Sequence, residues 1–371
     1  MTRAVISAWA AVSPFGIGGT AFAHGVAAGR RAVTPLGPGT GPVPQDRAAA
    51  VPGFDVREVL GRKGTRSLDR VSALSLATVD QLLGSDGRHR QVATGEHAAV
   101  VLGTTLGSAK SMMDITRDTL TQELPYFIDA ARIPNAVMNS AAAQCAIRHG
   151  IKGPNTTVAG GRTAGLFALR YALRLLSTGR ARAVLCGGAE ELTGERAWLE
   201  HHGSGTPASA ALGEGCGMFL VEPSAEAAVT DAPPVLAEIL AVETAVHTGE
   251  AWAGTAADCL RRALTRAGAT ADEIWAISPA GADGWDEAVR AVCAGLPDGH
   301  RPVRLPGDET WGDAGAATAS FQIASVLVTA EQDPSAPGRL AVVTSFDQGG
   351  VLGCALLRVY PYGTETRTED D

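Results

Sequence analysis

Short apolar runs bounded by glycine alternate along the chain with stretches whose apolar residues recur at helical spacing, and this alternation strongly constrains the fold. Strand-like runs occupy residues 98–102, 156–159, 183–187, 275–278 and 340–345. Leu166, Leu169, Leu173 and Leu176 recur at helical spacing, which predicts a helix over residues 164–177. Strands that alternate with helices predict an α/β fold in which helices cover parallel sheets.

A weak internal repeat relates residues 163–191 to residues 315–350. In each segment a helix rich in small residues is followed by a polar turn, an apolar strand and a pair of glycines. Such a repeat predicts two similar halves, with a junction in the Ala/Pro-rich stretch 224–234. We therefore predict an N-terminal half over residues 1–228, a C-terminal half over residues 229–362 and a disordered charged tail over residues 363–371.

Composition excludes several classes of function. The 371 residues are 45% hydrophobic and 19% charged, which suits a chain that buries a large core. The formal net charge of -8 argues against a general nucleic-acid surface, and only a local basic patch could serve an acidic partner. No apolar run approaches the roughly 20 residues of a membrane helix, and no signal-peptide pattern opens the sequence. We predict a cytoplasmic protein that binds neither nucleic acid nor membrane.

The cysteines and histidines do not form a recognisable metal or redox motif. The six cysteines are widely spaced, without a CxxC pair or a histidine at metal-ligand spacing, and most lie in apolar contexts that predict buried, inert thiols. His201 and His202 are adjacent and are expected to be a solvated loop pair. Cys145 and His149 are four residues apart on a predicted helix, as a nucleophile and its base could be. We expect no metal site.

Five segments, in the same order along the chain, resemble the condensing enzymes called ketosynthases. Residues 132–162 read RIPNAVMNSAAAQCAIRHGIKGPNTTVAGGR, and the others are RAVISAWAAVSPFG (3–16), LGTTLGS (102–108), GEGCGMFLVEP (213–223) and SFDQGG (345–350). The resemblance spans nearly the whole chain. It implies a thiolase-type fold, in which duplicated halves give a five-layered α-β-α-β-α architecture. It also places the helix of Cys145 and His149 in a dimer core, which favours packing over catalysis for this pair.

The residues that carry catalysis in ketosynthases are missing. In that family a cysteine on a strained turn at a helix N-terminus attacks the thioester, and two histidines polarise the malonyl carbonyl. The position matching the cysteine in VAGGRTAGL is Arg162, and a guanidinium is permanently protonated. The loop matching the first histidine, residues 279–284, has none, and Gly312 stands near the second position. The resemblance therefore implies no condensation by this chain alone, and we expect no cofactor.

Arg162 at a helix N-terminus is electrostatically unfavourable unless a carboxylate faces it. Asp283, Asp313 and Asp347 are the candidates, because each lies in a former active-site loop. We expect the side chain of Arg162 to fill the space that substrate would occupy in an active ketosynthase and to contact one of these carboxylates. The alternative is a functional mimic that reaches into the pocket or across a dimer interface.

In lacking the whole catalytic set, this chain resembles the chain length factor, which is the β-subunit of type II polyketide synthases. In that family an inactive subunit pairs with a catalytic ketosynthase, and the chain growing on an acyl carrier protein lies in a tunnel at their interface. The resemblance places Met112, Met113 and Thr116 at this interface, where their side chains would also close the tunnel. Met112 best matches the family position whose side chain ends the tunnel. Asp114 either makes the tunnel wall polar or is a solvated surface charge.

Two other functions stay open at this point. The chain could be an independent decarboxylase or acyltransferase in which Asp283 or Asp313 acts as a base. It could also be a scaffold that stabilises its partner without touching the acyl chain. Many chain length factors carry glutamine where the cysteine would be, so Arg162 departs from their pattern and leaves the subclass open.

Overall fold

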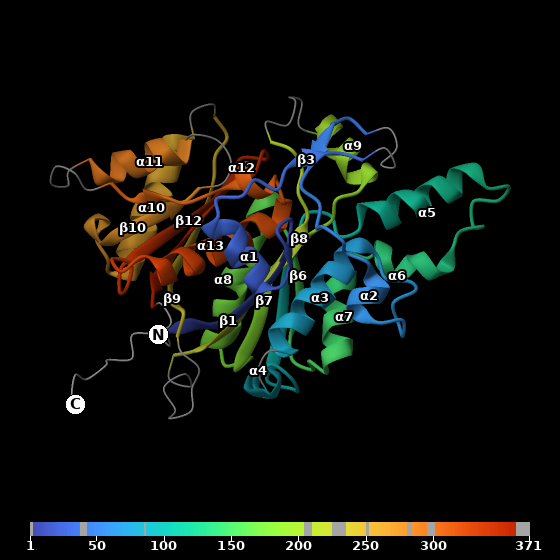
Figure 1. The fold of residues 1–371 in the computed structure, drawn as a ribbon, viewed down its shortest axis with the longest axis horizontal. Coiled ribbons are helices and arrows are strands. Elements are labelled where there is room, and N and C mark those ends of the chain that lie inside the picture. Colours follow the sequence, from blue (N-terminus) through green and yellow to red (C-terminus); the bar gives the residue numbers. More distant parts are fainter. Residues whose placement is uncertain are drawn as a thin grey trace.

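The computed structural model describes residues 3–37, 43–84, 87–203, 210–224, 235–249, 252–279, 284–294 and 301–360. Figure 1 shows two halves side by side, the N-terminal half on the right and most of the C-terminal half on the left. The predicted boundary at residues 228 and 229 and the predicted tail over residues 363–371 lie outside the described residues. The boundary therefore stays a prediction.

Each half is built on one sheet, and a short pairing between β1 and β9 joins the two sheets. In the N-terminal half the strand order is β1 (Ala4–Ser13), β8 (Gly215–Pro223), β7 (Ala183–Glu190), β5 (Ala98–Thr104) and β6 (Asn155–Ala159). In the C-terminal half it is β9 (Ala237–Val246), β13 (Val351–Val359), β12 (Leu340–Phe346), β10 (Ile274–Ser278) and β11 (Val303–Arg304). The remaining strands are short: β2 (Gly16–Ile17), β3 (Thr34–Pro35) and β4 (Arg47–Ala48).

Helices cover both faces of both sheets. The outer layer of the N-terminal half contains α2 (Val56–Leu60), α3 (Arg70–Gly84), α4 (Gly87–Val92) and α7 (Ser140–His149), and that of the C-terminal half contains α10 (Ala253–Ala267) and α11 (Gly284–Cys293). The layer between the sheets contains α8 (Ala164–Ser177) and α13 (Thr318–Gln332). The others are α1 (Gly19–Ala27), α5 (Ala109–Thr121), α6 (Ile133–Ala136), α9 (Gly194–Gly203), α12 (Asp308–Trp311) and the 3-10 turns η1 (Ala130–Arg132), η2 (Gly161–Thr163), η3 (Ala271–Glu273) and η4 (Gly315–Ala317).

The predicted α/β class is confirmed, and the helix predicted over residues 164–177 is α8. The sheets, however, are mixed and not parallel as predicted. β5 is parallel to β6 and β7, whereas β8 is antiparallel to both β7 and β1, and β13 is antiparallel to β12 and β9. A parallel pair needs a long crossover, whereas β12 and β13 are joined by the short turn 347–350, which permits only an antiparallel return.

The central helices pack unusually close to the strands, and small residues make this possible. A Cβ atom built on Gly103 of β5 would lie 2.6 Å from the carbonyl oxygen of Ala164, and one on Gly188 of β7 would lie 2.0 Å from that of Ala316. α13 is buried on nearly every side, as a helix enclosed between two sheets must be. This packing fixes the N-termini of α8 and α13 beside each other.

None of the helices that the structure describes is long and apolar enough to cross a membrane.

Candidate functional site

Arg162 lies in the turn between β6 and α8. The chain leaves β6 at Ala159, makes the 3-10 turn η2 and enters α8 at Ala164. Gly161 has a φ of +56°, and a Cβ atom there would lie 2.0 Å from Oδ1 of Asp347, so the turn requires glycine. This strand-turn-helix geometry presents the side chain of Arg162 beside the N-terminus of α8.

A cage of carboxylates surrounds Arg162. Its Nε donates to Oδ2 of Asp313 at 2.8 Å, and its Nη2 contacts the same oxygen and also Oε2 of Glu200 at 3.2 Å. Its Nη1 lies 3.8 Å from Oδ1 of Asp347, which also accepts a hydrogen bond of 3.0 Å from the backbone N of Arg162. Burial alone would lower the pKa of Arg162, but these three carboxylates outweigh it and raise the pKa. The guanidinium is therefore fixed in its charged form.

Of the three acidic residues expected near Arg162, two contact it. Asp313 follows α12 and Asp347 follows β12 in the C-terminal half, and Asp283 lies outside the described residues. Glu200 of α9 was missed, because nothing in its local sequence marks it. Gly312 does not contact Arg162 through a side chain, but its φ of +76° shapes the loop that delivers Asp313.

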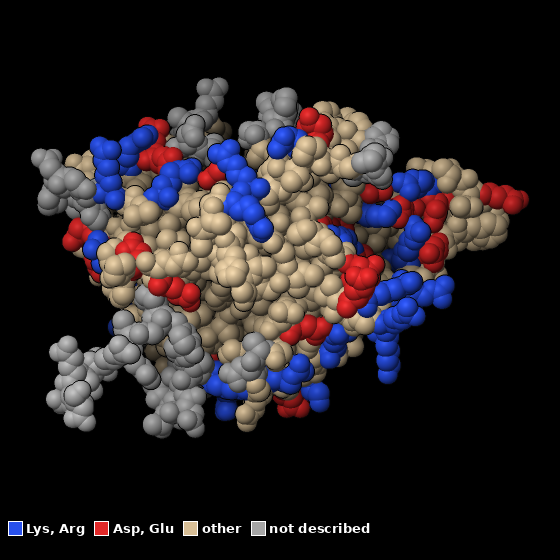
Figure 2. Space-filling model, viewed as in Figure 1, with Lys and Arg blue, Asp and Glu red and all other residues tan. Residues whose placement is uncertain are grey.

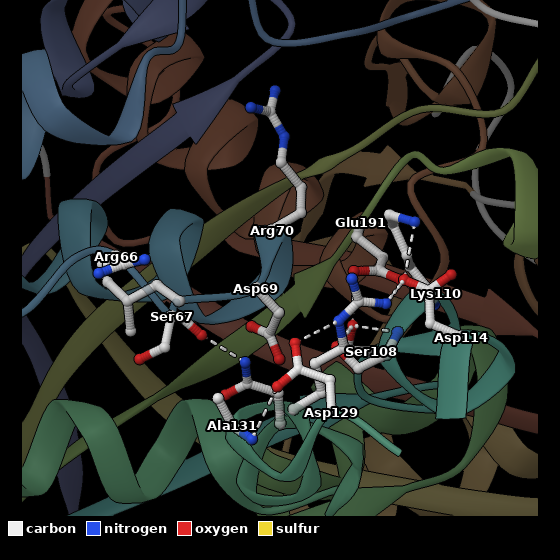
Figure 3. Close-up of a pocket in the computed structure, with 14 residues that line it drawn as sticks. Arg66, Ser67, Asp69, Arg70, Ser108, Lys110, Asp114, Asp129, Ala131 and Glu191 are labelled. Carbon is white, nitrogen blue, oxygen red and sulfur yellow. Dashed lines mark hydrogen bonds and ion pairs between the residues drawn. The ribbon is translucent and has the colours of Figure 1, made fainter. Parts of the chain in front are cut away.

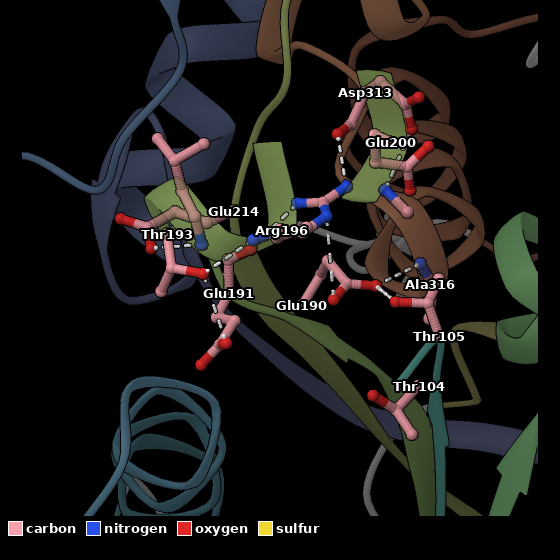
Figure 4. Close-up of polar contacts among 12 residues, drawn as sticks. Thr104, Thr105, Glu190, Glu191, Thr193, Arg196, Glu200, Glu214, Asp313 and Ala316 are labelled. Atoms are coloured by element: carbon pink, nitrogen blue, oxygen red, sulfur yellow. Dashed lines mark hydrogen bonds and ion pairs between the residues drawn. The ribbon is translucent and has the colours of Figure 1, made fainter. Parts of the chain in front are cut away.

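A second buried arginine holds that loop in place (Figure 4). Arg196 of α9 donates to the backbone carbonyl oxygens of Glu191 at 2.9 Å, Gly213 at 2.7 Å and Asp313 at 3.1 Å. Its Nε lies 3.9 Å from Oε1 of Glu190, a fully buried carboxylate that also accepts from the hydroxyl of Thr105. Burial raises the pKa of Glu190 although Arg196 acts in the opposite direction. No motif in the sequence around Glu190 or Arg196 marks this buried group.

The predicted tunnel residues lie elsewhere, on an arm formed by residues 106–138 that Figure 1 shows extending from the body. Met112 and Met113 are each 38% exposed, and Thr116 is exposed and donates to the carbonyl oxygen of Met112 at 2.8 Å. Met113 also lines a groove with Trp198 and Leu199 of α9. The structure therefore brings Met112, Met113 and Thr116 together on α5 but does not bring them to Arg162.

Asp114 differs from its neighbours on α5 because it is buried. Its carboxylate accepts from Lys110, Arg117 and Arg132 at 2.7 to 2.9 Å. Burial would raise the pKa of Asp114, but these cations outweigh burial and lower it. Of the two alternatives left open for Asp114, the solvated surface charge is wrong because the residue is buried, and the polar tunnel wall stays a prediction.

Asp114 lies on the wall of a polar cavity of about 750 Å³ between the arm and the N-terminus of α3 (Figure 3). Asp69 and Glu191 also line it. Glu191 accepts from the backbone N of Lys110 at 3.0 Å and the hydroxyl of Ser108 at 3.3 Å. Burial raises the pKa of Glu191 to about 7, and the charge of Asp69 adds to the shift. The cavity therefore contains a carboxyl group that titrates near neutral pH.

The raised pKa of Glu191 predicts a pH dependence of stability. The folded chain holds this proton more tightly than the unfolded chain, so the free energy of unfolding should fall as pH rises from about 4.5 to about 7. Each pH unit within this range should change it by up to about 1.4 kcal/mol. Glu191→Gln should flatten this slope in urea titrations, whereas the exposed control Glu123→Gln should keep it. An unchanged slope in Glu191→Gln would contradict the assignment.

Comparisons with known proteins agree with this geometry. Residues 1–227 match the family described as beta-ketoacyl synthase, N-terminal domain. The chain belongs to the beta-ketoacyl synthase family. It is 45% identical to a chain of the structure titled "The ishigamide ketosynthase/chain length factor", with a TM-score of 0.87 and coverage of 96% of this chain and 99% of that one.

One further solved structure and one sequence relative show how far the similarity of this beta-ketoacyl synthase family member extends. A type II polyketide synthase structure titled as an acyl-carrier protein in complex with its ketosynthase has 19% identity, a TM-score of 0.80 and coverage of 96% and 99%, which shows the shared fold. The 3-oxoacyl-(acyl-carrier-protein) synthase 2 of Vibrio cholerae serotype O1 is 26% identical over 144 residues, 39% of this chain. The match spans only about a third of that relative's length. The predicted thiolase-type fold and ketosynthase resemblance are confirmed.

The two cysteine and histidine pairs singled out in the sequence of this beta-ketoacyl synthase family member lie in different surroundings. Cys145 is buried, and burial raises its pKa well above the ordinary value for a thiol, while His149 lies 3.2 Å from Asp80 and not in a catalytic pairing. His201 and His202 belong to α9 and not to a loop, and His202 stacks on Trp198 with ring centroids 5.5 Å apart. Within the described ranges, no group of three or more histidine, cysteine or acidic residues could hold a metal ion.

Proposed function

We propose that this chain is a non-catalytic chain length factor. It would pair with a catalytic ketosynthase α-subunit, form one wall of the acyl tunnel and limit polyketide chain length during malonyl condensation on an acyl carrier protein. The observation that carries the proposal is Arg162, a permanently charged and carboxylate-bound side chain at the turn where the family has its nucleophile. The 45% identical structure, whose title names a ketosynthase/chain length factor, supports it.

The state of Arg162 argues against independent catalysis. A guanidinium cannot attack a thioester, and Asp313 is not free to act as a base because it binds Arg162 and accepts from the backbone N of Gly315 at 3.0 Å. Burial would raise the pKa of Asp313, but Arg162 and Arg196 lower it, and a carboxylate with a lowered pKa is a weak base. Condensation would therefore take place on the partner subunit.

Two surfaces suit a protein partner. The arm carries exposed apolar side chains, including Leu120 at 79%, Tyr126 at 71% and Val137 at 53% exposure. β6 is the outermost strand of the N-terminal sheet and is partly or fully exposed along its length. Exposed apolar groups and a free strand edge are the features through which chains associate, so we infer that the ketosynthase covers both.

A basic surface suits the acyl carrier protein. Four exposed cations lie on α2 and in the segment between α2 and α3: Arg57, Arg62, Lys63 and Arg66. Figure 2 shows Lys and Arg side chains gathered on this side of the molecule, below the arm. A local group of cations on a chain of net charge -8 would attract an acidic partner, and the strength of this attraction would fall with ionic strength.

The proposal is tested by size-exclusion chromatography with mass spectrometry of this chain alone and together with the ketosynthase from the same source. A stable one-to-one complex, with malonyl-dependent chain extension only when both chains are present, is the expected result. A homodimer that turns over malonyl or acyl thioesters unaided would show that the altered site is active.

The tunnel role predicts that the size of residue 112 sets product length. Met112→Ala should shift the products of the reconstituted pair to longer chains, because it would open the end of the tunnel, and Met112→Trp should shift them to shorter chains. Mass spectrometry of the products measures this shift. Val246→Ala, an exposed substitution on the C-terminal half, is the control. The same product distribution in all variants would favour a scaffold that stabilises its partner without touching the chain.

A further inference from the structure

The arm over residues 106–138 has no hydrophobic core of its own. All of its residues are described, and none belongs to any of the four hydrophobic clusters that hold the body together. Most of its large apolar side chains are instead exposed. A protruding pair of segments that buries no large apolar side chain must be held mainly by other forces if it is to keep one shape.

Charges around Asp114 supply that force. Lys110 and Arg117 come from the outgoing limb, α5, whereas Arg132 comes from the returning limb, η1. Arg132 reaches Oδ2 of Asp114 at 2.8 Å, the same oxygen that Lys110 contacts at 2.9 Å (Figure 3). One buried carboxylate therefore ties the two limbs together.

The same cations also bind the arm to the body. Lys110 and Arg117 each lie 3.6 Å from Oε1 of Glu195, which belongs to α9. Asp129 is the remaining acid near the returning limb, at 3.3 Å from Arg132. If Asp114 lost its charge, three cations would remain around a buried neutral group. The other acids near them are Glu195 and Asp129 at longer range and Asp69 and Glu191 on the cavity wall, and none of these replaces the contact that joins the two limbs.

We propose that Asp114 is a positioning residue that locks the two limbs of the arm together, so that the exposed apolar side chains are held ready for the partner subunit. The inference rests on the proposed function for the identity of that partner. The locking itself is a property of this chain alone. Preordering the arm lowers the entropy lost on association, so the lock would strengthen binding without itself touching the partner.

Hydrogen exchange tests the lock directly. In Asp114→Asn, peptides from residues 106–138 should exchange at least about tenfold faster than in the wild-type chain, while peptides from α8 and α13 should be unchanged. The Kd of the variant for the ketosynthase from the same source should rise by about tenfold. The matched control is Asp258→Asn, which removes an exposed carboxylate that pairs with Arg261 at 2.7 Å on α10.

A second pair of variants keeps the test informative if Asp114→Asn does not fold. Arg132→Met removes a half-exposed cation and should loosen the same peptides, and Arg132→Lys should restore part of the protection. Unchanged exchange over residues 106–138 in both Asp114→Asn and Arg132→Met would overturn the lock. Failure of the wild-type chain to bind the ketosynthase would instead overturn the proposed function, while the exchange result would still decide the role of Asp114.

Discussion

Replacing Arg162 by methionine should lower the free energy of unfolding by about 3–5 kcal/mol, measured by urea titration at pH 7. Methionine keeps an unbranched apolar stem but removes the guanidinium and the charge that Asp313, Glu200 and Asp347 share. The side chains of these acids are only 10%, 21% and 22% exposed, so water cannot fully replace the guanidinium. Three carboxylates would then face one another near the N-terminus of α8.

A double-mutant cycle separates this effect from a general loss of packing. Asp313→Asn should recover part of the loss when it is added to Arg162→Met, because it removes one of the unpaired charges. Because Arg162 lowers the pKa of Asp313, the stability that this pair contributes is present above the unfolded pKa of about 3.8 and is lost as pH falls through the lower folded value. The deficit of Arg162→Met should therefore shrink in acid. A deficit below about 1 kcal/mol at pH 7 would contradict the charge cage.

Much of the fold follows from local patterns in the sequence. The strand over residues 183–187 and the helix over residues 164–177 were predictable because glycine boundaries and leucine spacing are local signals. The direction of β8 was not predictable from such signals. Its pairing with β1 depends on contacts between residues more than 200 positions apart, and an apolar strand has the same pattern in either direction.

The site could be predicted only where a family motif marks it. Arg162, Asp313 and Asp347 were expected near one another because each lies in a segment that resembles an active-site loop of the ketosynthases. Glu200 and Arg196 lie on α9 in a stretch that carries no motif, and their contacts exist only once the fold has brought α9 to those loops. The burial of Asp114 depends on Arg132, which follows it by 18 positions and reaches it only because the arm doubles back.

The free edge of β6 supplies a second test with a large expected effect. β5 and β6 are parallel, with Leu102 opposite Thr157, and the backbone N of Val100 donates to the carbonyl oxygen of Pro154. In a parallel ladder the hydrogen-bonding direction alternates along each strand, so the backbone N–H of Thr157 points away from β5, toward the free edge. A partner strand that pairs with β6 would need this donor.

Thr157→Pro should therefore abolish formation of the heterodimer while leaving the isolated chain folded. Proline removes the outward N–H and blocks the approach of another strand, but it removes no hydrogen bond to β5, and an edge strand tolerates it. Analytical ultracentrifugation with the ketosynthase from the same source measures the loss of the complex, and circular dichroism of the variant alone checks its fold. Thr157→Val is the matched control, because it changes the same side chain and keeps the N–H. Complexes of equal strength for the proline and valine variants would mean that the partner covers the arm without extending the sheet, and that the interface lies on the apolar face of α5 and α6 alone.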